Sequence, residues 1–158
     1  MSGAIEREVE HEVECEVEHL DLRGRLPHGL SAVEASAGTG KTYALTALAV
    51  QGVVLDGLRT DELLVVTFTR AAAKELRGRI RTGMRDAAVA LRTLAATGEV
   101  PGGLDDWLDA LCRDGGGAGD PAPAPDEARR RASAAARALS TLDRATITTL
   151  HGFCQEAL

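Results

Sequence analysis

The stretch ASAGTGKT, from Ala35 to Thr42, constrains the fold of this 158-residue chain more than any other feature. It matches the phosphate-binding pattern of Gly, four arbitrary residues and Gly-Lys-Ser/Thr, except that Ala35 stands where the first Gly is usual. A Cβ at that position costs little when φ is negative, and the groups that would touch phosphate are all present. The motif therefore predicts a strand that ends in a phosphate-binding loop and continues into a helix.

The residue types in this loop match the chemistry of a triphosphate. Gly38 and Gly40 let backbone N–H groups turn toward phosphate, and the helix that follows adds the positive end of its dipole. Lys41 is predicted to reach the β and γ phosphates, and Thr42 to place its hydroxyl on Mg²⁺. The alternative is a Gly-rich turn that only joins a strand to a helix. The predicted nucleotide site comprises Ala35, Ser36, Ala37, Gly38, Thr39, Gly40, Lys41 and Thr42, with catalytic roles for Lys41 and Thr42.

The apolar pattern predicts an α/β fold in which helices cover a parallel sheet. The clearest strand is the continuous apolar run at 63–68, which is typical of a buried parallel sheet. The predicted elements in chain order are a weak strand at 31–35, a helix at 42–54, the strand at 63–68, a basic helix from Arg70 to about Ala96 with a soft break near Gly83, a turn at 101–103, a short helix at 104–112, a flexible loop at 115–125, a helix capped by Asp126 that ends near Leu142, and a strand at 146–150.

Composition and charge limit the remaining possibilities. Aromatic residues make up only 3% of the chain, so the core is expected to consist mainly of Ala, Leu and Val. Residues 1–20 contain seven Glu and one Arg, and this imbalance equals the whole formal charge of -6. We predict that 1–19 is a disordered acidic tail, in which His11 and His19 could alternatively hold a metal weakly. Three scattered cysteines and the lack of a signal sequence or membrane segment indicate a cytoplasmic protein without structural disulfides.

Two further motifs follow the loop, and together the three carry a resemblance to a known family. They read LLVVTFTRAAAKELRGRI at 63–80 and ATITTLHGFCQEAL at 145–158, after EASAGTGKT at 34–42. In this order they resemble the UvrD/Rep-like superfamily 1 DNA helicases, and especially the RecB type, the exodeoxyribonuclease V beta chain. The resemblance extends over residues 20–158. It implies a P-loop NTPase (RecA-like) fold and an enzyme that uses ATP and Mg²⁺. The process that it implies is DNA repair and recombination.

The resemblance also implies single-stranded DNA as a partner, and other RecBCD-type subunits in a complete protein. Hydroxyls and an Arg at strand ends can bond phosphates, and aromatic faces can stack on bases. Three alternatives stay open: Phe68 as core, His151 as a helix cap, and Arg77, Arg79 and Arg81 as a solvated helix face. Cys154 is expected to be a small buried hydrophobe. The residues matching the family's DNA-contacting motifs Ia and Ib are Thr67, Phe68, Thr69, Arg70, Thr149, His151 and Phe153.

ATP hydrolysis also needs a carboxylate at the end of a second apolar strand. The acidic pairs at 61–62, 105–106 and 126–127 do not follow such a strand. We therefore expect an incomplete motor domain, the N-terminal part of a RecB-type helicase, with weak nucleotide binding at most and no unwinding. One alternative is a small P-loop phosphotransferase that acts on a metabolite, with 115–125 as its lid. Another is a chain too incomplete to fold stably, because its sheet edges would be exposed.

Overall fold

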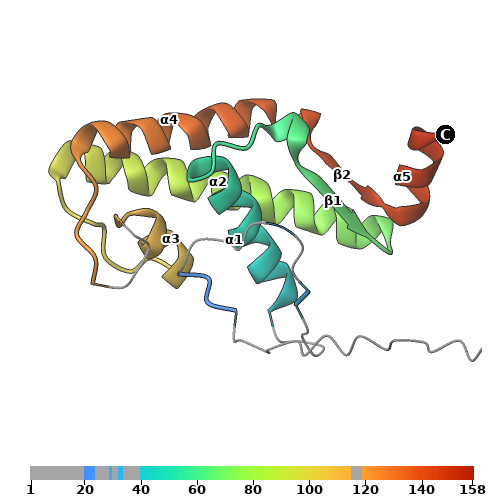
Figure 1. Ribbon diagram of the computed structural model, residues 1–158, viewed down its shortest axis with the longest axis horizontal. Helices are drawn as coiled ribbons and strands as arrows, with labels where there is room; N and C mark the ends of the chain where they lie inside the picture. The colour runs from blue at the N-terminus through green and yellow to red at the C-terminus, as the bar shows by residue number, and fades with distance from the viewer. Residues whose placement is uncertain (1–19, 24–28, 30–31, 34–39, 115–118) are drawn as a thin grey trace, which may run out of the picture.

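The computed structural model describes residues 20–23, 29, 32–33, 40–114 and 119–158. Long helices form one part of the molecule, and a small sheet lies toward the C-terminal end of the chain (Figure 1). The predicted acidic tail and most of the phosphate loop fall outside these ranges. The elements in chain order are α1 (Lys41–Val54), η1 (Thr60–Glu62), β1 (Leu64–Thr67), α2 (Arg70–Thr97), α3 (Asp106–Leu111), α4 (Pro125–Thr141), η2 (Leu142–Arg144), β2 (Thr146–Thr149) and α5 (Leu150–Ala157).

The two strands form a parallel sheet, as the apolar pattern predicted. β1 and β2 pair directly, and Thr67 lies opposite Thr149 at their common C-terminal end. Ile147 belongs to the core, while Leu64 and Val66 stay exposed on the other side of the sheet. The strand predicted at 31–35 is not observed at 32–33, which lie in neither helix nor strand; the other residues of that prediction are not described.

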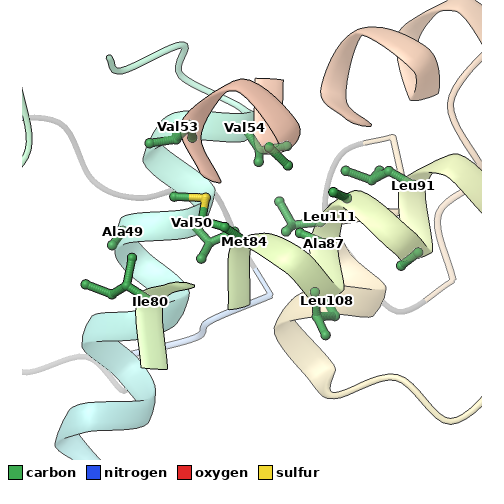
Figure 2. Packing of buried hydrophobic residues seen from close by; sticks show 14 of the residues in the cluster. Ala49, Val50, Val53, Val54, Ile80, Met84, Ala87, Leu91, Leu108 and Leu111 are labelled. Carbon is green, nitrogen blue, oxygen red and sulfur yellow. The ribbon is translucent and has the colours of Figure 1, made fainter. Parts of the chain in front are cut away.

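The core lies mainly between the helices and is built from small aliphatic side chains, as the composition predicted. α2 and α4 run alongside each other, and α1 packs against α2 (Figure 1). The inward face of α4 consists largely of alanine, so its backbone can approach α2 closely. Figure 2 shows side chains of α1, α2 and α3 meeting in this core. Those labelled are Ala49, Val50, Val53, Val54, Ile80, Met84, Ala87, Leu91, Leu108 and Leu111.

The break predicted near Gly83 was wrong, because α2 is one uninterrupted helix. A Cβ built on Gly83 would lie 3.1 Å from both Thr46 Cγ2 and Val50 Cγ2 of α1, and 3.3 Å from Trp107 of α3. Gly83 therefore has a packing role: because it has no side chain, α1 and the indole ring of Trp107 can approach the backbone of α2. The propensity cost of a helical glycine, about 1 kcal/mol, is offset by this contact.

The start of α4 differs from the prediction, because Ala124 and not Asp126 is its N-cap. Pro125 occupies the first helical position, where its fixed φ suits a helix and its missing N–H is not needed. Asp126 lies inside the first turn and forms an ion pair with Arg129. A carboxylate there interacts favourably with the helix dipole without capping the backbone.

The connection between α3 and α4 is fixed by arginine side chains. Arg131 of α4 is only 6% exposed, and its Nη1 donates to the backbone oxygens of Leu111 (3.0 Å) and Arg113 (2.9 Å). Its Nε donates to Glu127 at 2.7 Å. The same guanidinium therefore binds carbonyls at the C-terminus of α3 and a carboxylate of α4.

None of the helices in the described ranges is long and apolar enough to cross a membrane.

Candidate nucleotide and nucleic-acid site

The described part of the predicted phosphate loop is the start of helix α1. Gly40 is the N-cap of α1 and has φ 87°, a left-handed conformation that favours glycine. Lys41 and Thr42 are the first two residues of α1. The predicted loop residues Ala35, Ser36, Ala37, Gly38 and Thr39 lie outside the described ranges, so their roles stay predictions.

The N-terminus of α1 is suited to an anion. Gly40 offers no capping side chain, and the first turn of α1 contains no acidic residue. Backbone N–H groups in a first helical turn lack intrahelical partners and attract anions. Burial, and then the carboxylates of Asp105 and Asp106, raise the pKa of Tyr43, so this phenol stays neutral in the same turn.

The second candidate site lies where β1 and β2 end side by side. The hydroxyl of Thr69 accepts a hydrogen bond from the amide of Ala72 (3.1 Å) and caps α2. The hydroxyl of Thr149 accepts one from the amide of Gly152 (3.1 Å) and caps α5. Each strand thus ends in a threonine-capped helix start, and the sheet register holds the two junctions together. Each capping hydroxyl keeps its own proton for a further acceptor.

Gly152 has a structural role that the motif comparison did not identify. A Cβ at this position would lie 2.7 Å from the hydroxyl oxygen of Thr148 and 3.2 Å from that of Thr149. The first distance is shorter than any ordinary contact, so the two threonines require a glycine at this point. The sequence signal that could have revealed this is the placement of a glycine three residues after a capping threonine.

Replacing Gly152 with Ala is expected to lower the free energy of unfolding by about 1 to 2 kcal/mol, because the new methyl group displaces the hydroxyl of Thr148 and crowds the capping hydroxyl of Thr149. Urea denaturation followed by circular dichroism measures this change. Gly78→Ala is the matched control, since nothing lies within 4 Å of a Cβ there. That control should be neutral or stabilising by up to ~1 kcal/mol. Equal effects from the two substitutions would contradict the capping role.

An open pocket of about 590 Å³ lies between the starts of α2 and α5. Its cationic residues are Arg70, Lys74 and Arg77, and no Asp or Glu belongs to its lining. The N-termini of both helices add positive dipole ends. We call this pocket the cationic groove. It is lined by Phe68, Arg70, Ala73, Lys74, Arg77, Ile147, Thr148, Thr149, His151, Gly152 and Gln155.

The basic residues of α2 fall into two groups. Arg70, Lys74 and Arg77 are spaced by four and three residues, which places them on one helical face toward the groove. Arg77 is half-buried there and donates to the carbonyl oxygen of Ile147 at 3.1 Å. Arg79 and Arg81 instead form exposed ion pairs with carboxylates. The solvated-face alternative therefore holds for those two and fails for Arg77. The helical spacing from Arg70 could have indicated Lys74 and Arg77.

Four of the seven predicted DNA-contacting residues line the groove: Phe68, Arg70, Thr149 and His151. Phe68 is 91% exposed, so the alternative that it belongs to the core was wrong. His151 is exposed and the cap of α5 is Thr149, so the capping alternative was also wrong. The lining does not include Thr67, Thr69 or Phe153.

The two described cysteines differ in environment. Cys154 is exposed, so the prediction of a small buried hydrophobe was wrong: α5 contributes no described residue to the core, and this side chain faces outward. Cys112 is fully buried, and burial raises the pKa of its thiol to about 11. A thiol in that state is inert near neutral pH.

None of the acidic pairs follows the C-terminal end of a described strand, as the sequence indicated. Asp61 and Glu62 lie in η1, before the N-terminal end of β1, and Arg59 lowers the pKa of Asp61. Asp105 is the N-cap of α3, and Asp106 pairs with Arg23. Across the described ranges, no group of three or more His, Cys, Asp or Glu side chains could hold a metal ion.

Comparison with known proteins gives one family. The model of the UvrD/REP helicase N-terminal domain matches residues 23–158. The RecBCD enzyme subunit RecB of Mycobacterium tuberculosis is 37% identical over 145 residues, which are 90% of this chain and 12% of that protein. The protein of the same name from Escherichia coli is 36% identical over 143 residues, 85% of this chain and 11% of that protein.

One relative matches a shorter part of the chain with a higher sequence identity. An ATP-dependent helicase/nuclease subunit from Latilactobacillus sakei is 56% identical over 55 residues, which are 35% of this chain and 6% of that protein. The chain thus spans about an eighth or less of the curated relatives that it matches. Because the family model covers most of its residues, the chain belongs to the UvrD/REP helicase N-terminal domain family.

Proposed function

We propose that this chain is the ATP-binding and DNA-contacting N-terminal part of an ATP-dependent DNA helicase of the RecB type. The observation that carries the proposal is the cationic groove, which combines three basic side chains, no carboxylate and the 91% exposed ring of Phe68. An exposed aromatic ring beside cationic side chains offers a face on which an unpaired base can stack. The names of the relatives point to the same class of enzyme.

The polymer proposed for the groove is single-stranded DNA. Two threonine hydroxyls, two helix N-termini and the arginine and lysine side chains can bond phosphates without reading sequence. Phe68 and His151 offer faces for unpaired bases, which a duplex would keep stacked on one another. Contacts of this kind bind any sequence, as an enzyme that moves along DNA requires.

The ligand proposed for the α1 terminus is ATP with Mg²⁺. Gly40 and the acid-free first turn of α1 support this proposal, and Lys41 and Thr42 are the first two residues of that helix. We assign the ATP phosphates to residues 35–42 and the Mg²⁺ contact to Thr42. Bound ATP supplies the free energy for movement in a complete helicase.

In a complete protein we propose DNA repair and recombination as the process, together with partner subunits. The M. tuberculosis and E. coli relatives are by name subunits of a RecBCD enzyme. The phosphotransferase alternative gains no support from these matches. The segment that this alternative uses as a lid is hydrogen-bonded at its described end. The amide of Asp114 donates to the carbonyl oxygen of Pro121 (2.8 Å), and the side chain of Arg113 donates to the carbonyl oxygen of Asp120 (3.1 Å).

Replacing both Arg70 and Lys74 with Ala is expected to weaken binding of a labelled oligo(dT) roughly tenfold or more at low salt. The affinity should fall with salt, and the double substitution should reduce the slope of log K against log salt by about 1.4, since each lost phosphate contact counts ~0.7 on single strands. Fluorescence anisotropy across a salt series gives both quantities.

The matched control is Arg85→Ala with Arg92→Ala, two exposed arginines farther along the same helix and outside the groove. The control removes the same charge, so it separates the groove from net charge. The proposal fails if the control weakens binding as much as the groove variant. It also fails if the unaltered chain does not bind oligo(dT) at low salt, which is the result that the phosphotransferase alternative predicts.

A further inference from the structure

The cationic groove contains charges that the described chain leaves unpaired. Arg79 and Arg81 of α2 each meet a carboxylate, but Arg70 and Lys74 form no ion pair with any described residue. Both are exposed. Like charges gathered on one face repel one another, so the groove attracts an anionic segment of the same chain.

The chain contains such an anion outside the family match. Glu occupies every even position from Glu6 to Glu18, whereas the matched domain covers residues 23–158. The residues between these glutamates are mostly Val, His and Cys, and Arg7 is the only basic residue of the run besides histidine.

The spacing of these carboxylates suits a site for single-stranded DNA. In an extended chain, residues i and i+2 fall on the same side about 6.6 Å apart. Successive Glu carboxylates on that side would therefore be spaced about as far apart as successive phosphates of an extended DNA strand. Val and His side chains on the opposite side could contact the exposed ring of Phe68.

We propose that the acidic segment Glu6–Glu18 binds the cationic groove of its own chain and competes there with single-stranded DNA. The inference rests on the proposed DNA-binding role of the groove. A DNA strand must then displace the acidic segment from the groove, which lowers the apparent affinity of the chain for DNA. Weak or brief binding of nucleic acid is suppressed as a result. Because the competitor is tethered, its effective concentration does not depend on the protein concentration.

The segment is long enough to reach the groove. The chain after it is held to α1, where the side chain of Gln51 donates to the carbonyl oxygen of Leu22 at 2.6 Å. α1 meets α2 at Gly83, and Arg70 lies thirteen residues earlier in α2, about 20 Å away at 1.5 Å per residue. The fourteen residues from Leu20 back to Glu6 can span up to about 46 Å.

The first test measures oligo(dT) affinity at low salt in the full chain with Glu10, Glu12 and Glu14 changed to Gln. The matched control changes Asp56→Asn, Asp86→Asn and Glu99→Gln, which are exposed carboxylates without an ion pair in the described chain and outside the groove. Both variants gain three units of charge. The tail variant should bind DNA at least threefold more tightly than the unaltered chain, and the control should change affinity much less.

The second test locates the segment directly and does not depend on DNA. A nitroxide is attached to Cys15, with Cys154→Ser to remove the exposed thiol of α5; Cys112 is buried and does not react. Amide signals of Arg70 to Arg77 and Thr149 to Gln155 should broaden. The broadening should disappear on adding oligo(dT), or in about 1 M salt, where the Debye length is ~3 Å.

The outcomes separate the inference from the function on which it rests. Equal affinity gains in the two charge variants, or a nitroxide that leaves the groove signals unchanged, would overturn the inference while DNA binding stands. Groove broadening in a chain that never binds oligo(dT), with or without the tail carboxylates, would support the docked segment and overturn the proposed function.

Discussion

Replacing Arg131 with Met should lower the free energy of unfolding by about 3 to 5 kcal/mol, because it removes one partner from a buried charged network. The guanidinium is 6% exposed and donates to two backbone oxygens and to Glu127. Met fills a similar volume but offers no donor, so the carbonyls of Leu111 and Arg113 lose their partner. Urea denaturation followed by the fluorescence of Trp107 measures the loss.

Arg129→Met is the matched control for this prediction. Arg129 lies in the same helix and pairs with Asp126, but its side chain is 62% exposed, and exposed ion pairs contribute little. The control should change stability by less than about 0.5 kcal/mol. Arg131→Lys should restore only part of the loss, because an ammonium cannot reproduce the planar fork that reaches three acceptors. Similar losses at positions 129 and 131 would contradict the proposed network.

Replacing Trp107 with Ala should also lower the unfolding free energy by about 3 to 5 kcal/mol. Trp107 is 3% exposed and lies where α3 meets α1 and α2, beside Gly83. Its removal leaves a cavity at the contact that positions α1, and α1 carries Gly40, Lys41 and Thr42 at its start. Chemical denaturation followed by far-ultraviolet circular dichroism reports the loss, because the variant lacks the only tryptophan.

Trp107→Phe distinguishes the loss of volume from the loss of the indole. Phe keeps most of the ring volume, so this variant should lose about half as much stability as the alanine variant or less. A loss below about 1 kcal/mol for Trp107→Ala would show that the α1–α2–α3 junction does not depend on the ring.

The elements that the sequence predicted well are those in which local pattern and tertiary context agree. The apolar run before Phe68 predicted β1 within one residue at each end, and the basic helix was placed to within one residue at its end. The β-branched run before Leu150 predicted a strand at 146–150, which the structure has as β2 with one residue fewer. The nucleotide roles of Lys41 and Thr42 stay predictions.

Three features that the sequence did not reveal share a physical cause: each depends on which face of an element the rest of the fold covers. Gly83 is a helix breaker by propensity, but α1 and Trp107 use its missing side chain. Cys154 follows an apolar motif, yet α5 turns it outward. Arg131 is one of three consecutive arginines, and only the turn of α4 decides which of the three is buried. Sequence pattern alone does not contain these choices.

Gly83 lies almost at the midpoint of α2, thirteen residues after Arg70 and fourteen before Thr97. α2 therefore extends about 20 Å on each side of its contact with α1. A tilt of about 5° around the contact with α1 would move the groove end and the opposite end by roughly 2 Å in opposite directions. The contact between α1 and Gly83 therefore couples any tilt of α2 to the position of the cationic groove at its N-terminal end.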